Sequence, residues 1–478
     1  PKHLWKRFYE ITQVPRPSKK EEKIRAHFRE LLKNLKTEFK EDAIGNIVAL
    51  VPATPGYENA PTIVLQGHVD MVCEKNKDKQ HDFDNDPIAV SIKDGWVVAD
   101  GTTLGSDNGI GVAAGLAIIT DPDVVHGPIE ILMTVDEETG LTGANNLEPG
   151  FITGKILLNM DSEEDGAFYV GCAGGVDTVA TFEIKAEKKN PSTQVYELVV
   201  TGLKGGHSGL DIQEGRGNAI KILGRALKKL ERIDFKLAAI EGGSLRNAIP
   251  REAEVILSLS ENDFQDAVEI ITEFQKSIQN EYRTVDKNVN VFIKKNDLEF
   301  DNVFTEEFTK EIVNVILALP HGVISMSQDI NGLVETSTNL ATVNLVDGKI
   351  RIGTSQRSSA DSAKEYIANS VTAVFNLTDA YVEAGDGYPG WKPNMDSELL
   401  KVSKKVFKEF YGKEPEIKAI HAGLECGILE GKNPGMDMIS FGPTIQNAHS
   451  PDEKVNIETV AKFYYLLKGI LKEFANTK

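Results

Sequence analysis

The sequence predicts an α/β protein whose mixed, mostly parallel sheet is flanked by helices and interrupted by an inserted α+β domain. Short apolar runs alternate with helical runs in the first part of the chain, the pattern changes near residue 187, and the alternation resumes near residue 388. Strands that alternate with helices favour a parallel sheet covered on both faces. We therefore expect a first α/β segment over 1–186, an inserted domain over 187–387 and a second α/β segment over 388–478.

The first segment opens with helix signals and continues with strand signals. Ser18-Lys19-Lys20-Glu21 reads as a capping box, and the apolar spacing of "IRAHFRELLKNL" is helical. A second helical run, "IGVAAGLAII", lies among the short apolar runs. The predicted strands are "NIVALV", "TIVLQG", "IEILMTV" and "KILLNM".

The inserted domain shows the same order of elements twice. A strand at "VYELVVTGL" is followed by a helix, a strand pair and a second helix, and from about residue 288 the order recurs, starting with "NVNVFIKKN". We therefore expect two βαββαβ-like units in tandem. The Gly- and Pro-rich stretch "GDGYPGWKPN" is a linker back to the α/β part.

Charge and composition exclude several classes of partner. The net charge of −19 argues against nucleic acid and anionic membranes, because both would be repelled. Three widely spaced cysteines, Cys73, Cys172 and Cys426, imply no disulfide framework and fit a reducing compartment. The start of the chain lacks an apolar signal-peptide core, and no apolar run is long enough to span a membrane. We expect a cytoplasmic protein.

Acidic and histidine side chains follow several of the predicted strands. The carboxyl ends of parallel strands meet at one edge of a sheet, where ligands bind, so we expect these side chains to converge. Imidazoles with carboxylates suit zinc, and Asp107, in a glycine-rich stretch, is suited to bridge a metal pair. Each residue alone also fits a core histidine, a helix cap or a solvated loop; their joint occurrence favours a metal site. The side chains after strands are His68 and Asp70, then Asp136, Glu137 and Glu138, then Asp161, and finally His449.

Six motifs carry a resemblance to a known family. They are "GHVDMV", "DGTTLGSDNGIGVAA", "MTVDEETGLTGA", "LNMDSEEDG", "KGGHSGLDI" and "NAHSPDE". In this order, around an inserted domain, the motifs resemble the di-zinc metallopeptidase family of acetylornithine deacetylase, succinyl-diaminopimelate desuccinylase and carnosinase.

The resemblance implies a metal-ligand set and a catalytic group. His68 and Asp161 would hold one zinc ion, Glu138 and His449 the other, and Asp107 would bridge them. Asp70 would orient His68, and Glu137 would be the general base. The family also places a cis peptide after the bridging residue, here Asp107-Asn108.

The same resemblance implies that four further residues contact the substrate or the oxyanion formed from it. His207, in the inserted lid domain, would donate to the oxyanion, and Asn247 would lie near the same oxygen. Arg357 would bind the C-terminal carboxylate and Glu425 the free amine. From the residues alone, Asn247 equally fits a hairpin turn, Arg357 a surface cation and Glu425 a helix start.

The implied activity is hydrolysis of dipeptides with a free amine, Xaa-His dipeptides such as β-alanyl-histidine among them. It would use two Zn²⁺, which Co²⁺ or Mn²⁺ could replace. A deacylase or aminotripeptidase of the same family is an alternative. A second alternative is a non-catalytic metal-binding protein, but such a protein would not need Glu137. An NAD-dependent oxidoreductase is a further rival, because Gly109-x-Gly111-x-x-Ala114 fits a loose dinucleotide-binding fingerprint. In such enzymes the glycines directly follow a strand, and here "DGTTLGSDN" intervenes, which argues against this interpretation.

The expected assembly is a homodimer in which His207 acts on the partner subunit's site. The second lid unit offers no equivalent histidine in "VNVFIKKNDLEF". The opposing possibility is a monomer, because a doubled lid could imitate a dimer within one chain.

Overall fold

The computed structural model describes residues 1–477, which form two compact bodies. The α/β body comprises Pro1–Cys172, Trp391–Ala419 and Leu424–Lys478. The inserted body comprises Ala173–Gly390 and Ile420–Gly423. Within residues 1–477, no helix combines the length and the apolar character that a membrane crossing requires.

The α/β body is built on an eight-stranded mixed sheet, which confirms the predicted fold class. The sheet is parallel at its centre, in the pairs β6–β3, β3–β7 and β7–β23, and antiparallel toward both edges. The expectation of a mostly parallel sheet holds only for the centre, because β1 and β2 form a hairpin. The strand order is β1 (Glu38–Glu41), β2 (Ile47–Val51), β6 (Ile129–Thr134), β3 (Ile63–His68), β7 (Ile156–Asn159), β23 (Asp437–Ser440), β8 (Ala167–Cys172) and β22 (Glu416–Ile420).

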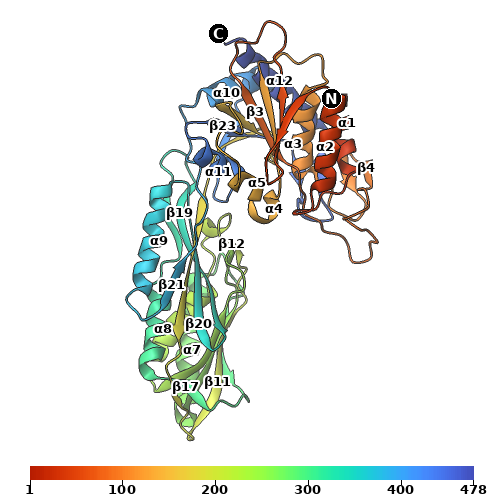
Figure 1. The fold of residues 1–478 in the computed structure, drawn as a ribbon. Helices are drawn as coiled ribbons and strands as arrows, with labels where there is room; N and C mark the ends of the chain where they lie inside the picture. Colours follow the sequence, from red (N-terminus) through yellow and green to blue (C-terminus); the bar gives the residue numbers. More distant parts are fainter. Residues whose placement is uncertain (478) are drawn as a thin grey trace. The chain divides into compact units, whose positions relative to one another are not determined.

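Helices cover both faces of this sheet (Figure 1). Helix α3 (Ser106–Ile118) is buried along nearly its whole length, because it packs between β3 and α1 (Lys2–Thr12). The other long helices are α2 (Glu22–Asn34), α10 (Glu398–Tyr411) and α12 (Ile457–Ala475). The shorter elements are α4 (Glu137–Gly140), α5 (Thr142–Asn145), α11 (Glu425–Lys432) and a small sheet of β4 (Val90–Lys93), β5 (Trp96–Ala99), β24 (Ile445–Gln446) and β25 (Lys454–Asn456).

The predicted capping box at Ser18 is wrong. Helix α2 begins at Glu22, and no side chain caps its first turn. The hydroxyl of Ser18 instead donates to Asp70 Oδ2 at 2.8 Å. Glu21 Oε1 accepts the backbone N–H groups of Lys19 at 2.8 Å and Asp136 at 3.0 Å. Both side chains therefore serve loops distant in sequence rather than the helix.

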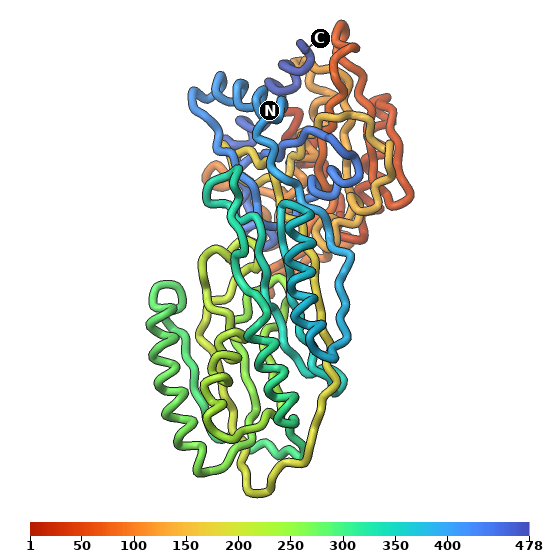
Figure 2. The backbone as a smooth tube through the Cα atoms, turned by 90° about the vertical axis from the view of Figure 1, so that its left-hand side faces the viewer, coloured from red at the N-terminus to blue at the C-terminus, as the bar shows by residue number. Residues whose placement is uncertain are grey.

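The inserted body has one nine-stranded sheet with helices over one face (Figure 2). Its apolar core lies between this sheet and α6 (Ala219–Leu230), α7 (Glu261–Glu281), α8 (Glu306–Ala318) and α9 (Asp361–Phe375). The strand order is β16 (Asn290–Lys295), β11 (Thr193–Thr201), β15 (Ala253–Ser260), β13 (Phe235–Gly242), β19 (Val334–Val346), β20 (Lys349–Ser358), β9 (Gly174–Glu183) and β21 (Tyr381–Ala384), and β18 (Gly322–Met326) pairs with β19.

The sheet consists of two similar halves, but their boundaries differ from the expected tandem order. One half has the order β16-β11-β15-β13 and the other β21-β9-β20-β19. Strand β16, expected to open the second unit, closes the first half beside β11. The second half takes β9 as its first strand, which pairs with β20 and β21. The compact body therefore begins at Ala173 rather than at residue 187, because β9 precedes the whole first half in the chain.

Candidate active site

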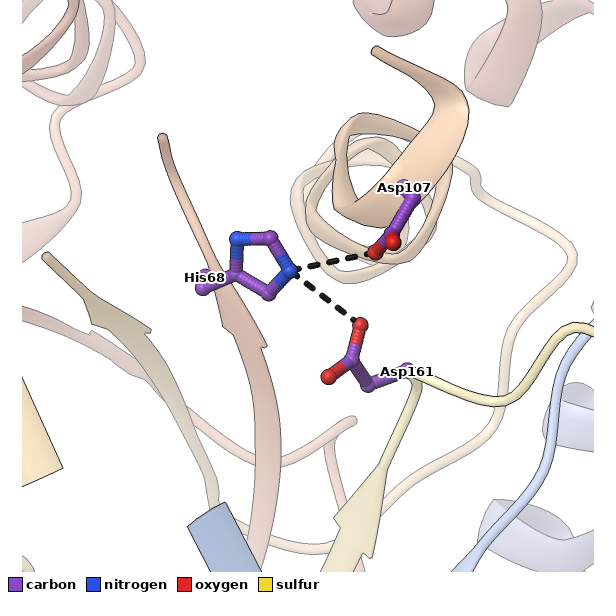
Figure 3. Close-up of side chains that lie close together, drawn as sticks. All are labelled: His68, Asp107 and Asp161. Atoms are coloured by element: carbon purple, nitrogen blue, oxygen red, sulfur yellow. Dashed lines mark hydrogen bonds and ion pairs between the residues drawn. The ribbon is translucent and has the colours of Figure 1, made fainter. Parts of the chain in front are cut away.

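Two groups of ligand-type side chains meet at Asp107. His68 Nε2 lies 3.1 Å from Asp107 Oδ1 and 3.3 Å from Asp161 Oδ1 (Figure 3). His449 Nε2 lies 3.1 Å from Asp107 Oδ2 and 3.1 Å from Glu138 Oε2. In each group the potential ligand atoms lie within 4.8 Å of one another. The structure thus brings together all the residues expected as ligands, with the Asp107 carboxylate shared between the groups.

The sheet edge and the adjoining loops place these side chains. His68 is the last residue of β3, and Asp161 follows β7 by two residues. Glu138 lies in α4, after Asp136 in the left-handed region at φ 49°. Asp107 lies at the start of α3, and the peptide to Asn108 is cis, as the resemblance implied. His449 also has a left-handed backbone, at φ 62°, a conformation rare outside glycine and retained at functional sites.

Asp70 connects the two groups. Its Oδ1 accepts from His68 Nδ1 at 3.2 Å and from the Glu137 N–H at 3.1 Å. Its Oδ2 accepts from the Glu138 N–H at 3.3 Å. Burial alone would raise the pKa of Asp70, but the bonds from His68, the Glu137 N–H and Ser18 outweigh it and lower the pKa to about 2. Asp70 is therefore ionised near neutral pH, where it orients the His68 ring and fixes the turn carrying Glu137 and Glu138.

The donor set fits divalent cations. Burial raises the pKa of Asp161 to about 7, and the neighbouring Asp107 adds to this effect. Glu138 Oε1 is buried without a hydrogen-bond partner among the described residues. A bound dication would keep such carboxylates ionised and supply the missing partner. Imidazole nitrogens with carboxylate oxygens are typical zinc ligands.

Glu137 lies beside the ligands and has the surroundings of a proton acceptor. Burial raises its pKa well above the usual value; His68 opposes this shift, while Asp161 and Glu425 reinforce it. Its carboxylate lies within 4.8 Å of ligand atoms of His68 and Glu138. A carboxylate with a raised pKa can take and return a proton near neutral pH.

Three residues near the ligands were not anticipated from the sequence. Arg16 and Glu453 are buried and hydrogen-bond the segments that carry the ligands. Glu163 is exposed, and its side chain contacts Asp107. Glu453 lies in the motif that supplies His449, so its proximity could have been inferred. Arg16 had no such signal, because its partners are backbone carbonyls of distant residues.

In the inserted body, His207 is held as a neutral donor. Its Nδ1 accepts the N–H groups of Gly209 and Leu210, each at 3.1 Å, so the ring proton resides on Nε2. Burial lowers the pKa of His207, and the positive charge of Arg357 adds to this effect. A neutral Nε2–H donor is the group that an oxyanion requires.

Arg357 is a buried cation without an anionic partner. The residue is 8% exposed, its Nη1 donates to the Tyr388 hydroxyl at 2.8 Å, and its buried Nε has no partner among the described residues. No carboxylate in residues 1–477 forms an ion pair with it. Arg357, Tyr388 and Asn247 line a cavity of about 510 Å³ within the inserted body. Such a guanidinium is suited to a ligand carboxylate.

Glu425 lies where a substrate amine has no direct access. The residue is 0% exposed, and its Oε2 accepts from Gln66 Nε2 at 2.6 Å and Thr134 Oγ1 at 2.8 Å. Burial raises the pKa of Glu425 to about 7. Its proposed contact with the substrate amine stays a prediction that this burial does not favour.

This combination of fold and side chains has a counterpart among known proteins. The model of the Peptidase family M20/M25/M40 matches residues 64–473, and the chain belongs to that family. The cytosol non-specific dipeptidase of Escherichia coli (strain K12) is 40% identical over 476 residues, covering 99% of this chain and 98% of the relative. The crystal structure of an aminoacylhistidine dipeptidase from Vibrio alginolyticus matches with a TM-score of 0.93 and 41% identity, covering 99% of this chain and 96% of the other. An aminopeptidase PepT structure from Bacillus cereus, at 20% identity and a TM-score of 0.55, shares the fold.

Proposed function

We propose that the chain is a zinc-dependent dipeptidase that hydrolyses dipeptides with a free amine, Xaa-His dipeptides such as β-alanyl-histidine included. The observation that carries the proposal is the sharing of Asp107 between two ligand groups, with Glu137 beside them. Two relatives that span almost the whole chain are a dipeptidase and an aminoacylhistidine dipeptidase by name.

His68 and Asp161 would hold one zinc ion, Glu138 and His449 the other, and Asp107 would contact both. When bound, such ions polarise a carbonyl and lower the pKa of water toward about 7. Glu137 accepts the proton of the attacking water and returns it to the leaving amine. Asp70 keeps His68 and the Glu137 turn in place. In this scheme His207 donates Nε2–H to the oxyanion, near Asn247.

Arg357 is the proposed contact for the C-terminal carboxylate of the substrate. Among the described residues, its buried guanidinium has no carboxylate partner, which supports this role, and the hydrogen bond to Tyr388 restricts its orientation. A substrate without a free C-terminus would lose this interaction. The inserted body would in this way measure the length of the peptide, which a dipeptidase requires.

The test is hydrolysis of a dipeptide panel by metal-stripped enzyme before and after zinc is restored. The panel contains β-alanyl-histidine and its N-acetylated form. Zinc-dependent cleavage of free dipeptides alone is the expected result. Cleavage of the acetylated form would instead support a deacylase, and no cleavage at all would support a metal-binding protein without catalysis.

We further propose a cytoplasmic homodimer in which His207 acts on the partner subunit's site. Strand β18, which pairs only with β19 among the described strands, leaves one edge free. It exposes Val323, Ile324 and Met326 by 38%, 42% and 45%, and unpaired apolar edges are sites of strand pairing between chains. The cysteines of the described chain are free thiols, which suits a reducing compartment.

Complementation tests this assembly. Separately inactive His207→Ala and Glu137→Ala chains are mixed under conditions that allow subunit exchange. Recovered activity supports action between subunits. A monomer by sedimentation, or a dimer that recovers no activity, contradicts it.

A further inference from the structure

Gly105, two residues before Asp107, lies between a buried cation and a buried anion. Arg16 Nη2 donates to the carbonyl of Gly105, while Glu453 Oε2 accepts the Gly105 N–H at 2.9 Å. Arg16 and Glu453 are 2% and 3% exposed. A Cβ at position 105 would lie 2.4 Å from Arg16 Nη2, and φ is 68° there, so this approach requires glycine.

Arg16 also holds the segment that carries His68. Its Nη1 donates to the carbonyl of Val69 at 2.9 Å and to that of Asp70 at 2.7 Å. One guanidinium therefore joins the end of β3 to the start of α3. The planar group with five donors can satisfy these separate carbonyls, which a lysine ammonium cannot match in geometry.

Glu453 joins the segment that carries His449 to the start of α3. It lies four residues after His449 and accepts the N–H groups of Leu104 at 2.8 Å and Ser106 at 2.7 Å. Its Oε1 also accepts the Ser106 hydroxyl at 2.6 Å. A carboxylate at the first turn of α3 satisfies N–H groups that the helix leaves unpaired and complements its dipole.

We propose that Arg16 and Glu453 are positioning residues that together set the place of the Asp107 carboxylate between the two imidazoles. Arg16 fixes it relative to His68, and Glu453 fixes it relative to His449. The inference rests on the proposed function, since it assumes that the two ligand groups bind metal. Groups that orient metal ligands typically contribute about 10- to 100-fold to metal affinity.

The experiment measures zinc affinity by competition with a chromophoric chelator, starting from metal-stripped protein. His68→Ala and His449→Ala identify which of the two binding steps belongs to which histidine. Glu453→Gln is expected to weaken the His449 step by about tenfold or more and the His68 step by less than about threefold. Arg16→Lys should show the opposite selectivity. The visible absorption of the Co²⁺-loaded variants should change with the affected step.

Matched controls separate positioning from general stability. Asp452→Asn removes the same charge at the neighbouring, exposed position, and Arg7→Lys alters a buried arginine that pairs with Glu10. Neither should change either affinity. Ser106→Ala removes one hydrogen bond to Glu453 and keeps the charges of Arg16 and Glu453. It should therefore lower the zinc affinity of the His449 step by less than Glu453→Gln does. This variant replaces Glu453→Gln if that protein does not fold.

Lower thermal stability of the metal-free variants, with unchanged affinities and an unchanged Co²⁺ spectrum, would overturn the inference. Equal weakening of both zinc-binding steps by each variant would overturn the assignment of Arg16 to the His68 step and of Glu453 to the His449 step. Failure of the wild-type protein to bind zinc would instead contradict the proposed function itself, so the two failures are distinguishable.

Discussion

The two bodies of this chain bury groups of opposite charge. The α/β body gathers the carboxylates of Asp107, Glu138 and Asp161 around two imidazoles, an arrangement with an excess of negative charge. The inserted body buries the guanidinium of Arg357 against a tyrosine hydroxyl, and no carboxylate of the described residues pairs with it. The cluster in the first body therefore favours cations, whereas the guanidinium of Arg357 in the second favours an anion.

This difference indicates a division of tasks in a peptidase. Bond cleavage needs cations that polarise a carbonyl, whereas recognition of a short peptide needs a group that detects its free carboxylate. Substitution of Glu137 or of the ligand residues in the α/β body should therefore reduce mainly kcat, and substitution of Arg357 should change mainly KM.

The largest expected effect is that of Glu137→Gln. The amide cannot accept the proton of the attacking water, so kcat should fall by about 10²- to 10⁴-fold. Zinc content, measured by elemental analysis, should stay at the wild-type value because Glu137 is not a proposed ligand. Glu148→Gln, an exposed carboxylate, is the control. Retained kcat in Glu137→Gln would remove it from the mechanism.

Arg357→Lys should have the next largest effect. Lysine keeps the charge but loses the two-pronged geometry, so KM should rise by about 10- to 100-fold with a smaller change in kcat. A dipeptide C-terminal amide should be poor for the wild type and no worse for the variant. Arg351→Lys, in the lining of the same cavity, is the control. An equal loss on carboxylate and amide substrates would contradict the assignment.

Glu163→Gln sharpens the comparison within the α/β body. Glu163 is an exposed side chain in contact with Asp107, so it is accessible to a substrate ammonium, unlike the buried Glu425. Desolvation of its carboxyl, with the charges of Asp107 and Asp161, raises its pKa to about 8, and a bound ammonium would favour the ionised form. We expect about a tenfold rise in KM for free dipeptides, from loss of a charge-assisted bond, and no change for des-amino analogues. Glu164→Gln is the control, since Glu164 pairs with Lys418 at 2.6 Å. Equal effects on both substrates would point to a change at Asp107 instead.

The last expected effect concerns the pH dependence of stability in the inserted body, and it leaves the chemistry of the site unchanged. Burial, with the charge of Arg357, lowers the pKa of His421 to about 3. The folded pKa lies below the unfolded value of about 6.5, so stability is fully present above about pH 6.5 and is lost as pH falls toward 3. One such proton contributes a slope of about 1.4 kcal/mol per pH unit. The free energy of unfolding of the metal-free protein is measured by denaturant between pH 6.5 and 4. Plotted against pH, it should have a slope smaller by this amount in His421→Asn than in the wild type; equal slopes would contradict the prediction.

The sequence allowed the α/β core and the set of side chains at its edge to be predicted. The runs that became β3, β6 and β7 have strand length and apolar character, and each is followed by a residue of the site. Their convergence could be inferred because parallel strands end at one edge. The pairing of ligands at Asp107 was available only through the resemblance.

Other features could not be read from the chain. Strand β9 looked like part of the α/β segment, because its partners β20 and β21 lie far along the sequence. Ser18 and Glu21 satisfied a local rule, but distant loops recruited both side chains. Arg16 contacts backbone carbonyls, whose positions depend on the fold rather than on residue type. The sequence therefore left open those contacts that depend on tertiary structure.

The interrupted path of the chain has a consequence for protein synthesis. Strands β3 and β7 emerge from the ribosome early, but β23, which completes the parallel centre beside β7, ends at Ser440. The last strand of the inserted body's main sheet along the chain, β21, ends at Ala384. At about 5–20 residues per second, the gap between these two points takes about 3–11 s. The inserted segment therefore completes its main sheet first, while the N-terminal α/β segment is left with the apolar edge of β7 exposed until β23 is made.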